Sequence, residues 1–186
     1  MALTSGCAEE AAAARVGDDT ISNQDLMAEV KALAGNEALL QQFQIPAEAI
    51  GGEADGSYSQ NFVGSVLVQR IGTMLLERAL DKKHVEVTDA DVATAQDQID
   101  QAIGTESEKL PEKYRKQLAH DIAVNNKLSE AYPDEAAARS ALQKIATETE
   151  ISVNSRYGTW DAKQFTITPP AGAATSSTST TSIPGG

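Results

Sequence analysis

A wide apolar stripe between residues 62 and 80 constrains the fold more than any other feature of the sequence. Its members recur at helical spacing: Phe62, Val63, Val66, Leu67, Ile71, Met74, Leu75 and Leu80. Residues three or four apart share one face of a helix, so a stripe this wide predicts a long helix in the core of a domain. Gly64 and Gly72 lower its helix propensity, and we expect them to allow close approach of a neighbouring helix.

Shorter helices are predicted on both sides of this stripe. Capping residues or a first-turn proline precede helical periodicity at five places: Ser22, Asn36, Thr88, Pro111 and Asp134. Residues 51–56 are turn formers and predict a loop before the long helix. Only 4% of the residues are aromatic, so Ala and Leu carry much of the apolar content, which favours helices.

A small β element is predicted from segments near the two ends. Val16 and Ile21 flank a Gly-Asp-Asp turn, so residues 14–21 predict a hairpin. Residues 151–153 alternate as in a strand, and residues 156–160 are expected to close the ordered region. Because a two-stranded hairpin is marginal alone, we expect residues 151–153 to pair with it. The fold class is mostly α, a helical array with a small β element.

Both ends of the chain differ in composition from the rest, and we predict one domain that spans residues 13–168. Residues 1–12 are expected to be flexible. They hold the lone Cys7 between small residues and an acidic run, which resembles a bacterial lipobox; an ordinary free thiol is the alternative. Residues 169–186 are rich in Pro, Ala, Gly, Ser and Thr. They predict a disordered tail, with an O-glycosylated stalk as the alternative.

Charge and residue content argue against several functions. A formal net charge of -12 opposes binding to nucleic acid and to anionic lipid. One cysteine excludes an intramolecular disulfide, and His84 and His120 are far apart and outside any zinc motif. Neighbouring aspartates at 18–19 and 89–91 fit a turn and a helix cap better than a catalytic dyad. We therefore expect no enzyme activity, no metal and no cofactor.

Three segments together resemble a known family. Residues 14–22 (ARVGDDTIS), 84–92 (HVEVTDADV) and 153–161 (VNSRYGTWD) are similar, in this order, to segments of the SurA- and PrsA-type chaperones. Two residues depart from the family pattern: its hairpin Asn is absent beside Gly17, and Ser155 replaces a common Pro. The resemblance implies a fold of the SurA N-terminal or trigger-factor C-terminal kind. Too few residues lie between 132 and 151 for the family's parvulin isomerase domain.

The resemblance implies an ATP-independent chaperone that binds unfolded or newly exported proteins at the cell envelope, anchored by a lipid on Cys7. The alternative is a structural lipoprotein that binds one specific envelope partner, and a prolyl isomerase is a third hypothesis. A client groove needs a contiguous exposed apolar patch. The long helix is expected to be core, whereas four side chains before the loop are the client-binding candidates: Leu39, Phe43, Ile45 and Ile50.

Overall fold

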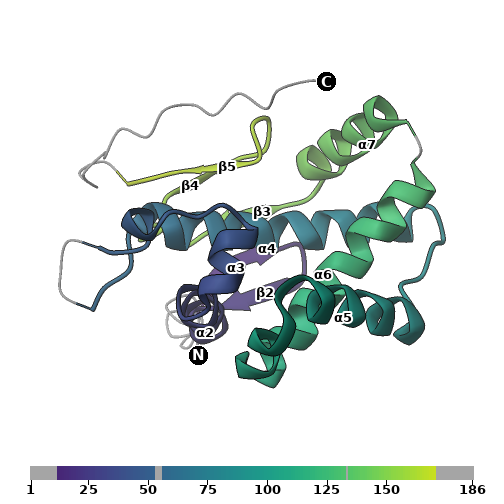
Figure 1. Ribbon diagram of the computed structural model, residues 1–186. Coiled ribbons are helices and arrows are strands. Elements are labelled where there is room, and N and C mark those ends of the chain that lie inside the picture. The colour runs from purple at the N-terminus through teal and green to yellow at the C-terminus, as the bar shows by residue number, and fades with distance from the viewer. Residues whose placement is uncertain (1–11, 53–55, 133, 171–186) are drawn as a thin grey trace, which may run out of the picture.

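The computed structural model describes residues 12–52, 56–132 and 134–170. It is mostly helical, with two small antiparallel sheets, as the sequence predicts (Figure 1). The elements in chain order are β1 (Ala12–Val16), β2 (Asp19–Ser22), α2 (Asn23–Ala34), α3 (Glu37–Gln42), the 3-10 helix η1 (Ala47–Ala49), α4 (Gln60–Asp81), α5 (Asp89–Ile103), the 3-10 helix η2 (Gly104–Lys109), α6 (Glu112–Ala131), α7 (Glu135–Glu148), β3 (Ile151–Val153), β4 (Thr159–Asp161) and β5 (Thr166–Thr168).

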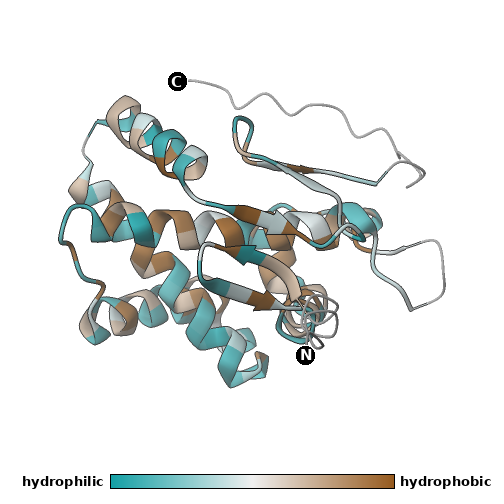
Figure 2. Cartoon of the chain, turned by 180° about the vertical axis from the view of Figure 1, so that it is seen from behind, coloured by the Kyte–Doolittle hydropathy of each residue, from teal (hydrophilic) through white to brown (hydrophobic). Residues whose placement is uncertain are grey.

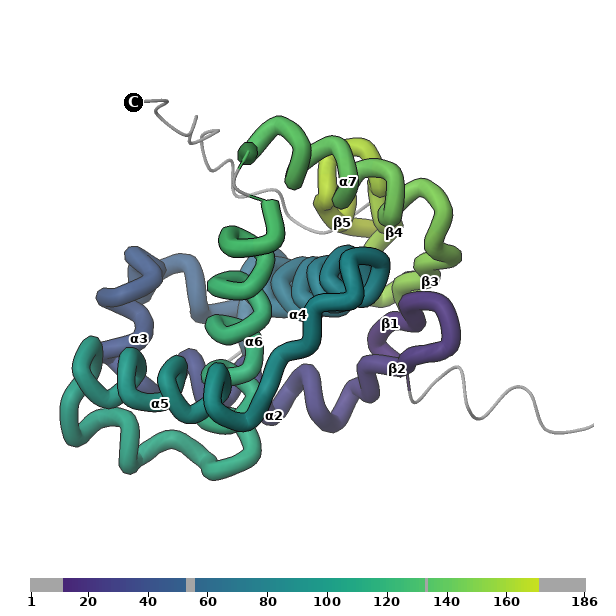
Figure 3. The backbone as a smooth tube through the Cα atoms, turned by 90° about the vertical axis from the view of Figure 1, so that its right-hand side faces the viewer, coloured from purple at the N-terminus to yellow at the C-terminus, as the bar shows by residue number. Residues whose placement is uncertain are grey.

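The apolar stripe forms α4, the helix around which the other elements pack. Figure 3 looks nearly along α4, which contacts α2, α6, α7, β1 and β5. Apolar residues recur along its whole length in Figure 2, and Leu67 and Ile71 are fully buried. The expectation for Gly64 and Gly72 is wrong, because a Cβ added at either position would meet nothing within 4 Å.

The segments near the two ends of the domain meet in one sheet, as predicted. Its strand order is β2-β1-β3, and β3 pairs antiparallel with β1, placing Val16 opposite Ile151. The Asn154 side chain continues this contact by donating a hydrogen bond of 3.1 Å to the Ala12 carbonyl. Strand β1 begins at Ala12, which had been assigned to the flexible N-terminal segment. Backbone pairing and burial of Val16 therefore join segments that are far apart in sequence.

Four of the five predicted helix starts are confirmed by side-chain caps, and the fifth, Pro111, directly precedes α6 without a side-chain cap. The side chains of Ser22, Asn36 and Asp134 each accept a hydrogen bond from a backbone N–H of the first turn. Thr88 forms a full capping box with Asp91. Such bonds satisfy N–H groups that have no partner within the helix, which explains why local sequence fixes these boundaries.

A second hairpin, β4–β5, lies within the predicted domain of residues 13–168 but continues past the segment 156–160 that was expected to close the ordered region. Trp160 pairs with Ile167, and its ring packs edge-on against Phe165 at 6.3 Å between centroids. The turn is held by Asp161, whose Oδ1 atom accepts hydrogen bonds from the backbone N–H groups of Lys163 and Gln164. This aspartate turn is the signal that the sequence interpretation missed.

Candidate functional site

The predicted client-binding segment starts at the buried end of α3. Asn36 is buried and uses both ends of its amide: Oδ1 accepts from the Leu39 N–H, and Nδ2 donates to the Glu106 carbonyl, both at 3.0 Å. These bonds fix the direction of the first turn and turn Leu39 inward, where it is only 2% exposed. Leu39 therefore belongs to the core and not to an accessible groove.

A turn follows α3, and the apolar side chains of this turn lie at the edge of the core. Gln44 adopts a left-handed φ of 55°, and the Ile45 N–H donates to the Leu40 carbonyl at 2.8 Å. Ile45 and Ile50 are half-buried and pack against the core, whereas Phe43 is 43% exposed. Phe43 is thus the most accessible of the four candidate side chains.

The segment from η1 to α4 is tied to the body by backbone bonds. Ser59 caps α4, its hydroxyl donates to the Ala49 carbonyl at 2.5 Å, and its N–H donates to the Ile50 carbonyl at 2.8 Å. These contacts hold Ile50 close to the start of α4. The candidate segment is therefore a surface turn that hydrogen bonds hold in place.

Large apolar side chains are scarce on the surface of the described part of the chain. Only Met27, 38% exposed, and Phe43 are both large and exposed there. A broad apolar cradle is therefore not present among these residues in this conformation. Cys7, the proposed lipidation site, lies outside the described residues.

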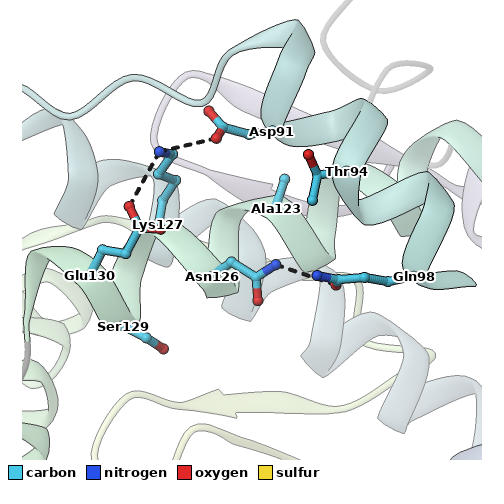
Figure 4. Close-up of a pocket in the computed structure, with 8 residues that line it drawn as sticks. All are labelled: Asp91, Thr94, Gln98, Ala123, Asn126, Lys127, Ser129 and Glu130. Atoms are coloured by element: carbon cyan, nitrogen blue, oxygen red, sulfur yellow. Dashed lines mark hydrogen bonds and ion pairs between the residues drawn. The ribbon is translucent and has the colours of Figure 1, made fainter.

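An open polar cleft of about 400 Å³ lies between α5 and α6 (Figure 4). Its lining is almost entirely polar: Asp91, Thr94, Gln98, Ala123, Asn126, Lys127, Ser129 and Glu130. The Lys127 ammonium bridges Asp91 at 3.0 Å and Glu130 at 3.3 Å. Hydrogen bonds from Thr88 and Lys127 lower the pKa of Asp91 to about 2. The charged groups of this cleft are already paired with one another, so it offers no free charge to a ligand.

A charged cluster, defined by Glu29, Arg70 and Asp121, lies where α2, α4 and α6 contact one another. Their side chains are 12%, 18% and 8% exposed. Arg70 Nη1 donates to Asp121 Oδ1 at 3.4 Å, and Gln117 donates to the same oxygen at 2.8 Å. Arg70 Nε lies 3.2 Å from Glu29 Oε1 without a hydrogen bond, because no acceptor is aligned with its N–H. Asp121 is thus better hydrogen-bonded than Glu29.

Burial dominates the acid–base behaviour of the charged cluster. It raises the pKa of Glu29 from 4.5 to about 7, against the attraction of Arg70, and it raises the pKa of Asp121 as well. The pKa of the nearby Tyr114 is also raised, first by burial and then by the two carboxylates. Near neutral pH the cluster can bind or release a proton, but no Ser, Thr or Cys nucleophile takes part in the contacts described for it.

Sequence reasoning missed the charged cluster because its members are separated by whole helices. Arg70 is a charge within the span of the apolar stripe, and that was the only local signal. His120 and Asp121 are neighbours in the sequence, but such a pair belongs to a catalytic triad only with a nucleophile and suitable geometry. In the structure His120 Nε2 instead contacts Glu77 Oε1 at 2.6 Å, while Asp121 points to Arg70.

Within the described ranges, no three His, Cys, Asp or Glu side chains are grouped so that they could hold a metal ion. None of the helices described there is long and apolar enough to cross a membrane. Comparison of the chain with protein-family models, with curated proteins and with solved structures finds no match.

Proposed function

We propose that this chain is an ATP-independent chaperone domain that binds unfolded or newly exported proteins at the cell envelope. The observation that carries the proposal is the pairing of β3 with the β1–β2 hairpin around a helical body. The resemblance to SurA- and PrsA-type chaperones implies this arrangement for segments near residues 14–22 and 153–161. In the structure β3 pairs with β1 although 130 residues lie between those two segments.

The client contact is proposed at the turn after α3. Phe43 is exposed there, close in sequence to the half-buried Ile45 and Ile50, and an exposed aromatic ring supplies a large apolar contact for an extended chain. The patch is small, so each contact with a client is weak and binding is broad and reversible. The acidic surface keeps a protein that exposes such a patch soluble.

Aggregation of an unfolded client in the absence of ATP tests this proposal. We expect the wild-type chain in molar excess to suppress light scattering, and Phe43→Ser to suppress it less. Gln42→Ser, at the neighbouring exposed position, is the matched control and is expected to behave as wild type. Absence of suppression by the folded wild-type chain contradicts the proposed function, and equal activity of Phe43→Ser contradicts the proposed contact site.

The scarcity of exposed apolar side chains favours a second candidate, a lipoprotein that binds one specific folded partner. A specific interface buries roughly 800 Å² on each side and does not need a continuous apolar surface. Pull-down from native envelope distinguishes the two candidates. One stoichiometric partner supports the second candidate, whereas many substoichiometric unfolded proteins support the chaperone.

The proposed envelope location depends on lipidation of Cys7. Metabolic labelling with a fatty acid is expected to mark the wild-type precursor and not Cys7→Ser. Equal labelling of both chains contradicts the proposed anchor without affecting the chaperone proposal.

Catalysis of prolyl isomerisation is not part of the proposed function. The uncatalysed step takes tens of seconds, so a proline-limited refolding reaction is slow enough to follow. We expect no acceleration by the wild-type chain, and a clear acceleration contradicts the assignment as a non-enzyme.

A further inference from the structure

The charged cluster holds one more negative charge than positive charge when both of its carboxyl groups are ionised. Arg70 supplies a single cation between Glu29 on α2 and Asp121 on α6. All three side chains are largely removed from water, at 8% to 18% exposure. An uncompensated charge in such a place is strongly unfavourable, so the cluster favours a state in which one carboxyl group is neutral.

Hydrogen bonding selects which carboxyl group binds the proton. Asp121 accepts from Gln117 and from Arg70, and these bonds stabilise its ionised form. Glu29 has only the unaligned contact with Arg70 Nε at 3.2 Å. Glu29 is therefore the proton acceptor, and it lies on the helix that the cluster attaches to the body.

We propose that the charged cluster is a proton-sensitive joint, which holds α2 against α4 and α6 when Glu29 is protonated and loosens that packing when Glu29 is ionised. The apolar face of α2 carries Leu26, Val30 and Leu33, all buried in the core. Loosening of α2 therefore weakens the cover over this part of the core.

The groups around the cluster do not cancel its charge. They come from the same three helices: Asp25 from α2, Glu77 from α4, and Lys113, Tyr114 and His120 from α6. Lys113 contacts Asp25, and His120 contacts Glu77, so each outer charge already has a partner. His120 lies next to Asp121 on α6 and contacts Glu77, so it needs its own control.

The direction of the pH effect follows from the pKa of Glu29, which rises from 4.5 to about 7 on folding. Between these values the folded chain holds a proton that the unfolded chain has released, so stability falls as pH rises through this window. The raised pKa of Asp121 acts in the same direction. Carboxyl groups with lowered pKa values, such as Asp91, exert their effect at lower pH.

Urea unfolding of four chains tests the proposal: wild type, Glu29→Gln, Glu108→Gln and His120→Gln. For wild type we expect the unfolding equilibrium constant to rise about thirtyfold between about pH 5.5 and about pH 8. Glu29→Gln mimics the protonated group, so it is expected to remove most of this rise and to be more stable than wild type at the higher pH. Glu108→Gln, at an exposed position, and His120→Gln are expected to keep the rise.

Two outcomes overturn the proposal: a wild-type stability that does not fall across this range, or a Glu29→Gln chain that is weakened equally at both pH values. The second outcome identifies Glu29 as an ordinary ion-pair partner of Arg70. If Glu29→Gln does not fold, the ¹³C shift of the Glu29 carboxyl group in the wild-type chain decides the matter. A titration midpoint near 7 supports the joint, and a midpoint at the ordinary value of 4.5 overturns it.

Hydrogen exchange shows whether α2 itself loosens. After correction for the intrinsic exchange rates, we expect residues 23–34 to lose protection on going to the higher pH, while α5 keeps its protection. The same residues in Glu29→Gln are expected to stay protected. Equal loss of protection in α2 and α5 overturns the local joint.

Discussion

The strand junction, formed by β1, β2 and β3, and the charged cluster both attach an N-terminal element to the body, but by different chemistry. In the strand junction Val16 is fully buried between backbone-paired strands. In the charged cluster a single guanidinium faces two carboxyl groups. The free energy gained by burying apolar area depends little on pH, whereas the free energy cost of burying carboxyl groups depends directly on whether they are ionised. We infer that pH acts on α2 and leaves the strand junction unchanged.

The largest expected effect comes from removing the cation of the charged cluster. Arg70→Met keeps the apolar stem but leaves two carboxyl groups without their countercharge. We expect a loss of about 3 kcal/mol in the free energy of unfolding near pH 8, and a smaller loss near pH 5.5, where a carboxyl group is neutral. Urea unfolding at both pH values measures it. The control is Arg139→Met, whose side chain is 76% exposed, and an equal loss at both pH values contradicts the expectation.

A buried side chain of the strand junction provides the contrasting case. Val16→Ala removes apolar volume from a fully buried position. We expect a loss of about 2 kcal/mol that is the same at both pH values. Arg15→Ala alters the exposed neighbour in the same strand and is expected to have little effect. If the loss at Val16 varies with pH, the proposed difference between the two regions is wrong.

The smallest effect is expected from removing an exposed ion pair beside the strand junction. Arg78 Nη2 donates to Asp19 at 2.8 Å, but the Asp19 side chain is 59% exposed, so water and salt weaken the attraction. For Asp19→Asn we expect a loss below about 1 kcal/mol that shrinks further at high salt. A loss as large as that at Arg70 contradicts the view that burial makes the ion pair important. Arg78 also donates to the Val16 carbonyl at 2.7 Å, and we expect this bond to remain in Asp19→Asn.

Local signals explain which parts of the fold were predictable. Ser22 and Thr88 cap helices through bonds that span three residues, and such short-range chemistry can be read from the sequence. The apolar period of α4 is likewise local. The β4–β5 hairpin was missed because its strands are only three residues long and give a weak period.

The candidate site was predicted less well because it depends on how helices pack. Leu39 and Phe43 are both apolar in the sequence. The capping bond of Asn36 to the Leu39 N–H accompanies the burial of Leu39, whereas Phe43, at the end of α3, is exposed. Glu29 and Asp121 are ordinary acidic residues in sequence. Their shared Arg70 brings them together only after three helices have packed.

The contact between Ala12 and Asn154 also governs when the domain can be completed. This hydrogen bond joins positions 142 residues apart, whereas the contacts within each helix span only a few residues. During synthesis the helices can form as they emerge, but β1 must wait for β3. Until then one side of the first hairpin is an unpaired strand edge, the kind of surface to which other chains add. The nascent domain is therefore most vulnerable to misassembly just before its last strand arrives.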